Sequence, residues 1–378
     1  MPEYYEIKIK GQLNQRWSEW FAGLKLTQLE RDVTLLSGSL PDQSALHGLL
    51  ERIRDFNLTL ISVTSGNPSD QNADMEKNPI TGSKGINQHN VEKETSMQKI
   101  ILVIGGTGTL GQPVSRYLKD AGFQVRIMTR DRQRAEKIFD DSFEIFVGDP
   151  LNVNCVEEAL NGCYGVHISL PTGVEQQVAE TVAKVASRHG VERISYISGA
   201  TVAEENRWFP MIDGKYLAEK AIREAGIPYT IICPTWVMEI LPKFVIQGRA
   251  SILGKQPCPS HWVAAEDIAR MVSTAYHLGE ADNQRLIVHG PEAICMQEAL
   301  RRYCAMFHPE IKNISSMPFW LVKLLVAITG DNGLKGAGEM MSYFEKIGEG
   351  SNLPKMNAIL GAPTMTLDTW LQKRKVME

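Results

Sequence analysis

The segment from Lys99 to Gly111 combines an apolar run with a glycine-rich turn. Ile100–Ile104 are followed directly by the sequence Gly-Gly-Thr-Gly-Thr-Leu-Gly. When a buried strand leads through such a turn into a helix, the glycines let backbone N–H groups approach a pyrophosphate, and the helix N-terminus adds partial positive charge. The turn therefore predicts a dinucleotide site. Its candidate contacts are Gly105, Thr107, Gly108, Thr109, Leu110 and Gly111.

The end of the next expected strand discriminates between the two nicotinamide dinucleotides. A site for NAD usually carries Asp or Glu about 20 residues after the turn, where it binds a ribose hydroxyl. Here the expected strand Gln124–Thr129 is followed by Arg130, Arg132 and Arg134. A guanidinium suits a 2′-phosphate through charge-assisted, bidentate hydrogen bonds. Arg130 therefore favours NADP(H) over NAD(H), and a solvated basic helix start is the alternative interpretation.

Two further strand ends carry short polar residues. Gly148 and Asp149 follow the third expected strand, Phe143–Val147, where a polar group can hydrogen-bond the adenine ring. Ser169 lies at the end of the fourth apolar run, Val166–Leu170, and would lie along the ribose. We expect no metal site, because the six cysteines are widely spread, with no Cys-x-x-Cys pair and no Cys/His ligand spacing.

The elements that must position these residues alternate between strand and helix. Further apolar runs occur at Ile194–Ile197 and Thr230–Cys233, and helical segments occur at Gly111–Ala121, Val174–Arg188 and Asp213–Ala225. This alternation is typical of an α/β domain whose parallel sheet is covered by helices on both faces.

The N-terminal part has a different pattern. Residues 1–64 are expected to form strand, helix, strand, strand, helix, strand, which is the order of a ferredoxin-like α+β sandwich, βαββαβ. Trp17, Trp20 and Phe21 share one face of the first helix, and Asp42 is a plausible N-cap of the second. Residues 65–98 contain no aromatic residue and are rich in Asn, Ser and Gly, which predicts a flexible linker before a domain over residues 99–375.

Charge and hydropathy exclude two classes of function. With 40 basic and 44 acidic side chains the net charge is −4, so no global basic field supports a nucleic-acid partner. The longest apolar run, Phe319–Ile328, is interrupted by Lys323 and is shorter than the roughly 20 residues of a spanning helix. The N-terminus lacks the pattern of a secretory signal. We therefore expect a cytoplasmic protein without a transmembrane segment.

Residues 99–375 resemble an atypical short-chain dehydrogenase/reductase of the NmrA-like kind. The resemblance rests on the glycine turn, on Thr129-Arg130, on Gly148-Asp149, and on Lys215–Glu219 followed by Gly226–Pro234. It implies a Rossmann-type doubly wound parallel sheet with a small substrate-side subdomain, and NAD(P) as cofactor. The N-terminal part resembles a short bacterial module to which no chemistry is assigned.

The resemblance also implies a Ser, Tyr and Lys trio, in which lysine lowers the tyrosine pKa so that the phenol can protonate a developing alkoxide. A literal Tyr-x-x-x-Lys occurs at Tyr216–Lys220 and is one possible register. The family spacing to Gly226 and Pro234 places the lysine instead at Lys215, and the tyrosine position then holds Met211, which cannot transfer a proton.

The serine of the trio is also replaced. Alignment on the end of the fifth strand places Gly199 at its position, with Ser198 adjacent. The resemblance therefore implies a chain that keeps the lysine, with Lys215 as the candidate catalytic residue and Lys215 and Ser198 as cofactor contacts.

These residues favour an NADP(H)-dependent oxidoreductase that transfers hydride to a small apolar acceptor such as a quinone, enone or carbonyl compound. Its pocket would form from Pro234–Met238 and from residues 311–345, which are rich in Met, Phe and Trp. One alternative is a non-catalytic dinucleotide-sensing regulator with a protein partner. The other, a nucleotide-sugar epimerase or dehydratase, needs the missing tyrosine. A homo-oligomer is possible in each case.

Overall fold

The computed structural model describes residues 3–10, 24–29, 33–55, 59–65, 99–171, 173–349 and 353–377. The chain divides into two compact units, Met1–Glu92 and Lys93–Glu378. Each unit has a hydrophobic core of its own.

The N-terminal unit contains a four-stranded antiparallel sheet with one described helix. The sheet has the order β2-β3-β1-β4, with both central strands paired on each side. This is the strand order of a βαββαβ sandwich, as the sequence predicts. The bounds are β1 (Glu3–Lys10), β2 (Lys25–Leu29), β3 (Val33–Leu40), α1 (Gln43–Asp55) and β4 (Thr59–Ser65). The predicted first helix, with Trp17, Trp20 and Phe21, lies outside the described residues.

Alternation along β1 builds the small core. Tyr5, Ile7 and Ile9 are buried on one face of the strand, because successive side chains of a strand point to opposite faces. Buried leucine and isoleucine side chains of α1 belong to the same core. The carboxylate of Asp42 accepts a hydrogen bond of 2.8 Å from the backbone N–H of Ala45, so the predicted N-cap is confirmed.

The larger unit is organised around a seven-stranded sheet in which every described strand pair is parallel. The spatial order is β7-β6-β5-β8-β9-β10-β14. From β5 the chain first adds β6 and β7 on one side and then adds the other strands on the opposite side, as in a doubly wound Rossmann sheet. The bounds are β5 (Ile100–Ile104), β6 (Gln124–Thr129), β7 (Glu144–Val147), β8 (Cys163–Ile168), β9 (Arg193–Ile197), β10 (Tyr229–Pro234) and β14 (Gln284–Val288). The strand β14 is not among those that the sequence predicts.

Helices cover both faces of this sheet and form two separate cores. Helices α2 and α7 pack against one face, and α4, α5 and α6 pack against the other. The bounds are α2 (Gly111–Asp120), α3 (Arg132–Glu136), α4 (Val153–Leu160), α5 (Glu175–Ala186), α6 (Pro210–Glu224) and α7 (Ala265–Ala275). Helix α6 begins earlier than the sequence predicts, because Pro210 supplies a favourable first helical residue.

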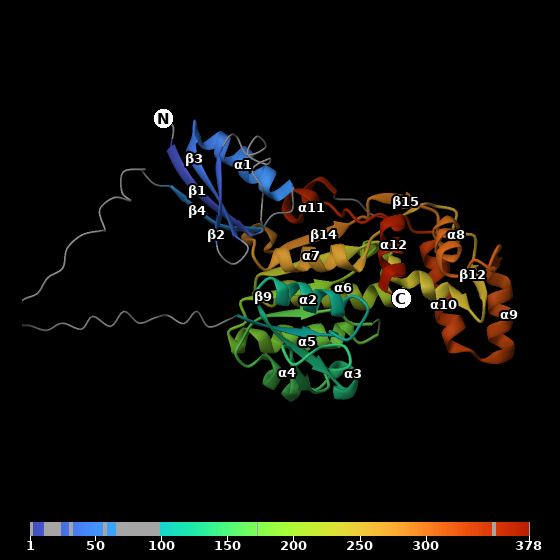
Figure 1. Ribbon diagram of the computed structural model, residues 1–378. Coiled ribbons are helices and arrows are strands. Elements are labelled where there is room, and N and C mark those ends of the chain that lie inside the picture. Colours follow the sequence, from blue (N-terminus) through green and yellow to red (C-terminus); the bar gives the residue numbers. More distant parts are fainter. Residues whose placement is uncertain are drawn as a thin grey trace, which may run out of the picture. The chain divides into compact units, whose positions relative to one another are not determined.

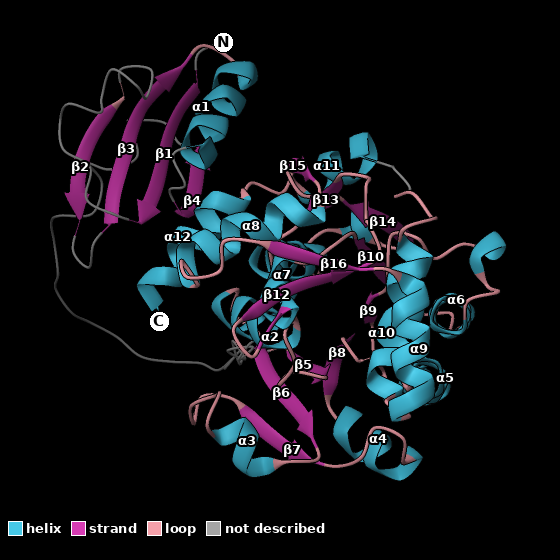
Figure 2. Ribbon diagram, turned by 90° about the vertical axis from the view of Figure 1, so that its right-hand side faces the viewer, coloured by secondary structure: helices cyan, strands magenta, loops and turns pink. Residues whose placement is uncertain are grey.

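A smaller lobe follows β10 and has a third core. It contains a three-stranded sheet, β11-β12-β16, and a two-stranded sheet, β13-β15. Figure 1 shows β12, α8, α9 and α10 together at one end of the unit, and Figure 2 shows α9 and α10 side by side. The bounds in the lobe are β11 (Val245–Ile246), β12 (Arg249–Leu253), β13 (Ser260–Trp262), β15 (Glu292–Ile294), α8 (Met296–Phe307), β16 (Ile314–Met317), α9 (Phe319–Thr329), α10 (Asn332–Phe344) and α12 (Leu367–Met377). Helix α11 (Leu353–Leu360) packs instead against β14 and α7 of the parallel sheet.

Helix α9 is apolar and yet mostly uncovered. Val322 is its buried residue, whereas Trp320, Leu324 and Ile328 are exposed. Within the described ranges, no helix combines the length and the apolar character needed to cross a membrane.

Two thiols lie deep in the parallel sheet. Cys163 on β8 and Cys233 on β10 are buried in the core on the α4–α6 face. Burial raises the pKa of the Cys163 thiol to about 11 and that of Cys233 to about 12, because the charged thiolate loses its hydration there.

Candidate functional site

The turn between β5 and α2 leaves no space for side chains at its first and last glycines. Gly105 has φ of +91°, and a Cβ there would lie 1.9 Å from the carbonyl oxygen of Ser169. A Cβ at Gly111 would lie 2.1 Å from the carbonyl oxygen of Gly105. Glycine is therefore required at both positions, at one for the left-handed backbone and at both for close approach.

The N-terminus of α2 has free capacity to bind an anion. Its N-cap, Leu110, makes no side-chain capping hydrogen bond, and the first turn contains no acidic residue. The backbone N–H of Gly108 donates to the carbonyl of Gly105 at 3.0 Å, which closes the turn in front of the helix. Unsatisfied N–H groups at a helix start are the ordinary ligands of a phosphate. The turn thus fits the pyrophosphate of a dinucleotide.

Basic side chains follow β6 on the neighbouring strand end. Arg130 is exposed, and among the residues described no ion pair or hydrogen bond engages its guanidinium. Arg134 reaches back to the glycine turn, with its Nη2 3.4 Å from the carbonyl oxygen of Thr107. Arg132 pairs instead with Glu136. The sequence singles out Arg130, but the structure also brings Arg134 to the turn.

The next strand end is held by the backbone. The N–H of Gly148 donates to the carbonyl of Thr129 at 2.9 Å, and a carboxylate oxygen of Asp149 accepts from the N–H of Leu151 at 3.1 Å. Asp149 therefore fixes its own turn beside the strand end at which adenine is expected. None of the described residues donates a hydrogen bond to its second carboxylate oxygen.

A cavity of about 940 Å³ opens beside the glycine turn. The predicted site residues Leu110, Ser169, Ser198 and Lys215 line it, together with Gly199 and Met211. The lobe supplies its apolar wall, which includes Trp236, Met317, Leu334, Met340 and Phe344. Of the predicted pocket stretch, Pro234, Thr235, Trp236 and Val237 line the cavity, whereas Met238 is packed in the core of the lobe.

Lys215 enters the cavity with a buried carboxylate behind it. Its Nζ lies 2.8 Å from a carboxylate oxygen of Glu175, whose side chain is only 1% exposed. Glu175 is the first residue of α5, and its other oxygen accepts from the N–H of Gly173. An ion pair buried to this extent fixes the ammonium in one place. Glu175 is not among the residues that the sequence predicts, because no local pattern relates the start of α5 to the middle of α6.

The literal Tyr-x-x-x-Lys lies outside the cavity. Lys220 is exposed and 3.9 Å from Glu224, and the ring of Tyr216 faces the guanidinium of Arg207 at 4.7 Å. Another tyrosine, Tyr196, is fully buried beneath Lys215 and does not line the cavity. Burial, followed by the charges of Glu175 and Glu219, raises the pKa of Tyr196 well above its ordinary value. The described residues thus offer no tyrosine at the cavity wall.

Ser198 lines the cavity, but its hydroxyl is already engaged by a buried carboxylate. Its hydroxyl donates to the carboxylate of Glu219, which is 1% exposed. The same carboxylate accepts from Arg223 and Arg285, so a buried polar network ties β9, α6 and β14 together. The Ser198 hydroxyl therefore serves this network in the structure, and a cofactor contact through it remains a prediction.

The comparison with protein families agrees with this architecture. A model described as the NmrA-like family matches residues 97–353. The chain belongs to the NmrA-like family. A second model, described as a domain of unknown function, matches residues 4–64.

Characterised relatives of this NmrA-like chain differ in what their names describe. It is 27% identical over 201 residues to an NAD(P)H azoreductase of Xenophilus azovorans, covering 52% of this chain and 69% of the relative. It is 23% identical over 244 residues to the photosystem II assembly factor Ycf39 of Trieres chinensis, covering 61% of this chain and 76% of the relative. The family therefore contains NAD(P)H-binding reductases and also assembly factors.

Solved structures share the fold. The triphenylmethane reductase of a Citrobacter species, complexed with NADP(H), has a TM-score of 0.60 at 18% identity, over 72% of this chain and 99% of that one. An NADPH-dependent quinone oxidoreductase of Escherichia coli has a TM-score of 0.59 at 18% identity, with the same coverage. At this identity the likeness shows the NAD(P)-binding fold.

Proposed function

We propose that this NmrA-like protein is an NADP(H)-dependent oxidoreductase that transfers hydride to a small apolar acceptor of the quinone, enone or carbonyl class. The observation that carries the proposal is one continuous cavity, which extends from the end of the glycine turn to the apolar lobe. Leu110 and Lys215 line one part of it, and Met317, Met340 and Phe344 line another. A cavity of about 940 Å³ lies at the upper end of the 300–1,000 Å³ common for small-molecule sites.

The chain's own residues bind and orient the reactants. The glycine turn and the start of α2 would hold the pyrophosphate, and Arg130 would hold a 2′-phosphate. Lys215, fixed by Glu175, offers its ammonium protons to ribose hydroxyls and places a positive charge beside a bound oxygen. Bound NADPH supplies the hydride. The apolar wall excludes water and selects acceptors mainly by shape.

The test is reduction of a panel of acceptors by the full-length protein with NADPH. Benzoquinone, a naphthoquinone, an azo dye and an aromatic enone cover the classes proposed. Turnover of at least one acceptor is expected. The variant Ala337→Trp places a larger side chain at the cavity wall and so narrows the cavity. It should raise KM for the naphthoquinone more than for benzoquinone. Tight NADPH binding with no turnover of any acceptor would contradict the proposal.

A non-catalytic dinucleotide-binding role is the second candidate. The observation that favours it is that Met211 and Gly199, neither of which can transfer a proton, line the cavity where the resemblance implies tyrosine and serine. The similarity to a photosystem II assembly factor supports the same candidate. Under this alternative NADPH binds and no acceptor is reduced, so the acceptor panel separates the two. An epimerase would need a proton-transferring tyrosine, and Tyr216 lies outside the cavity.

A further inference from the structure

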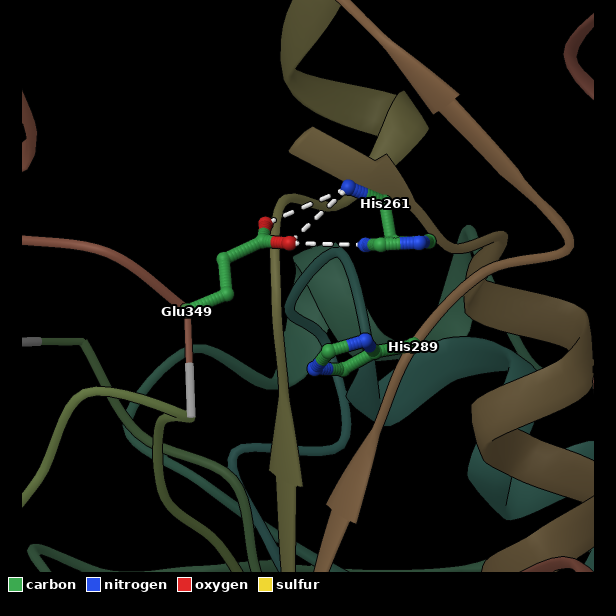
Figure 3. Close-up of side chains that lie close together, drawn as sticks. All are labelled: His261, His289 and Glu349. Atoms are coloured by element: carbon green, nitrogen blue, oxygen red, sulfur yellow. Dashed lines mark hydrogen bonds and ion pairs between the residues drawn. The ribbon is translucent and has the colours of Figure 1, made fainter. Parts of the chain in front are cut away.

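Two histidines and a glutamate form a cluster that the proposed hydride transfer does not use. His261 belongs to β13, His289 directly follows β14, and Glu349 follows α10 and lines the cavity. Figure 3 shows the three side chains together, with the Glu349 carboxylate beside the edge of the His261 ring and the His289 ring below them. Within the part of the chain that the structure describes, this is the one group of three or more His, Cys, Asp or Glu side chains with ligand atoms close enough to share a metal ion.

Nitrogen and oxygen atoms of the three side chains lie close to one another. A carboxylate oxygen of Glu349 lies 2.9 Å from Nδ1 of His261, and both carboxylate oxygens accept from the His261 backbone N–H at 3.1 and 3.2 Å. The rings of His261 and His289 stack with centroids 4.5 Å apart. One ligand atom from each residue lies within 4.8 Å of the others.

The backbones that carry the two histidines are packed directly against each other. A Cβ at Gly290 would lie 1.5 Å from the carbonyl oxygen of Trp262, so only glycine permits this approach. Thr235 links both segments, because its hydroxyl donates to the His261 carbonyl and its N–H donates to Val288 at 3.1 Å. The histidines are thus held on rigid segments, and Glu349 is the ligand that arrives from a loop.

We propose that His261, His289 and Glu349 bind one zinc ion at the wall of the cavity. Two imidazoles and one carboxylate form a borderline donor set that suits Zn²⁺, whereas Mg²⁺ and Ca²⁺ prefer oxygen ligands throughout. Two histidines and a glutamate are also the protein ligands of zinc sites that keep a fourth position open. Glu349 lines the cavity, whereas the two histidines do not, and water would complete the tetrahedron at the fourth position.

The distances require a small closure of the side chains. Zinc bonds of about 2.0–2.1 Å place tetrahedral ligand atoms roughly 3.3–3.4 Å apart. Ligand atoms that now lie up to 4.8 Å apart must therefore approach one another by about 1.5 Å when the ion binds, and the proposal requires the Glu349 and His261 side chains to change rotamer. Both side chains are partly exposed and are held by their mutual hydrogen bonds, whereas His289 is buried.

The test uses metal-stripped, untagged full-length protein and does not depend on turnover. Calorimetric titration with Zn²⁺ should give one equivalent per chain, and Co²⁺ should give the intense visible bands of a four-coordinate site. Glu349→Gln keeps the size and hydrogen-bonding capacity of the side chain and should weaken Zn²⁺ binding by more than about 100-fold, since even outer-shell losses cost 10–100-fold. His308→Gln, which removes a histidine outside the cluster, is the matched control and should bind as the unmodified chain does.

A thermal melt guards against misfolded variants. Excess Zn²⁺ should raise the Tm of the unmodified chain and of His308→Gln, and should leave that of Glu349→Gln and His261→Gln unchanged, because a ligand stabilises only the state that binds it. Absence of stoichiometric binding in the unmodified chain would overturn the proposal. So would equal Zn²⁺ affinity in the unmodified chain and in both cluster variants. Neither result depends on whether NADPH reduces an acceptor.

Discussion

At the scale of single residues, Arg130 is the side chain that is expected to discriminate between NADPH and NADH. We predict that Arg130→Ala weakens NADPH binding and leaves NADH binding nearly unchanged, because only NADPH carries the 2′-phosphate. Loss of a charge-assisted hydrogen bond costs about 1.5–3 kcal/mol, which is roughly 10- to 150-fold in affinity. Titration of nucleotide fluorescence measures both affinities. Arg132→Ala is the control, since Arg132 pairs with Glu136.

An equal loss for both nucleotides would contradict this assignment of Arg130. A loss that appears only when Arg134 is also replaced would move the role to the arginine beside Thr107.

Lys215 is the residue on which cofactor positioning is expected to depend. Lys215→Met should weaken NADPH binding and abolish any turnover, because three donors are lost at the cavity wall. Glu175→Gln should weaken binding less, since it removes the charge that fixes the ammonium and keeps the lysine. Tyr216→Phe should change neither quantity. NADPH affinities and steady-state rates of these variants decide between Lys215 and the Tyr216–Lys220 pair as the catalytic position. An inactive Tyr216→Phe together with a normal Lys215→Met would show that Tyr216 and Lys220 are the true pair.

These residues also show how far local sequence patterns reach. The family spacing to Gly226 and Pro234, which the resemblance supplies, identifies Lys215, and the structure places this lysine at the cavity wall. Nothing of this kind predicts Glu175, or the meeting of His261, His289 and Glu349. Their contacts join separate elements, and each residue alone is ordinary on its own element.

At the scale of elements, the central strands carry a buried histidine whose charge is coupled to pH. His167 on β8 has its Nδ1 2.7 Å from the Ser195 hydroxyl on β9, which lies 3.0 Å from the hydroxyl of Tyr276. Burial lowers the pKa of His167 to about 3, because the imidazolium would be without water. The ring is therefore neutral in the folded chain well below the pH at which it protonates after unfolding.

This difference predicts acid sensitivity of the parallel sheet. In the unfolded chain His167 protonates near its ordinary pKa of about 6.5, and in the folded chain only near 3. Its contribution to stability is complete above pH 6.5 and is lost as pH falls toward 3, at about 1.4 kcal/mol per pH unit. Between pH 6.5 and 5 the free energy of unfolding should drop by about 2 kcal/mol from this residue.

Urea unfolding at several pH values measures the slope. His167→Gln should flatten it relative to the unmodified chain. His308→Gln, at a partly exposed position, should leave it unchanged. A slope that His167→Gln does not alter would show that other groups govern acid unfolding.

Elements with a local signature are the ones that the sequence predicts. Six strands of the parallel sheet appear as apolar runs. The five central ones are continuously hydrophobic because they are buried on both faces, whereas β7 lies at one edge and is partly exposed. The edge strand β14 alternates between buried and partly exposed residues, Gln284 and Arg285 among them, and escaped prediction. The short strands β12 and β16 of the lobe pair across a long stretch of chain, so no local pattern specifies them.

At the scale of the whole molecule, the two units should separate functionally. We predict that a chain beginning at Lys99 binds NADPH as tightly as the full chain, because the glycine turn, Arg130 and Lys215 all belong to the larger unit. Calorimetric titration of both proteins tests this, with circular dichroism as the control for folding. A folded, shortened chain that binds NADPH more weakly would show that residues 1–64 contribute to the site.

The two buried thiols of the sheet can report when its strands open. Cys163 and Cys233 have thiol pKa values of about 11 and 12, so almost no thiolate is present at neutral pH while the strands remain paired. Alkylating reagents and peroxide attack the thiolate, and both sulfurs are also shielded from them. Each thiol becomes reactive only when its strand leaves the sheet. The two sulfurs therefore serve as internal reporters of rare opening events, in strands on either side of β9, under conditions where the folded population is undisturbed.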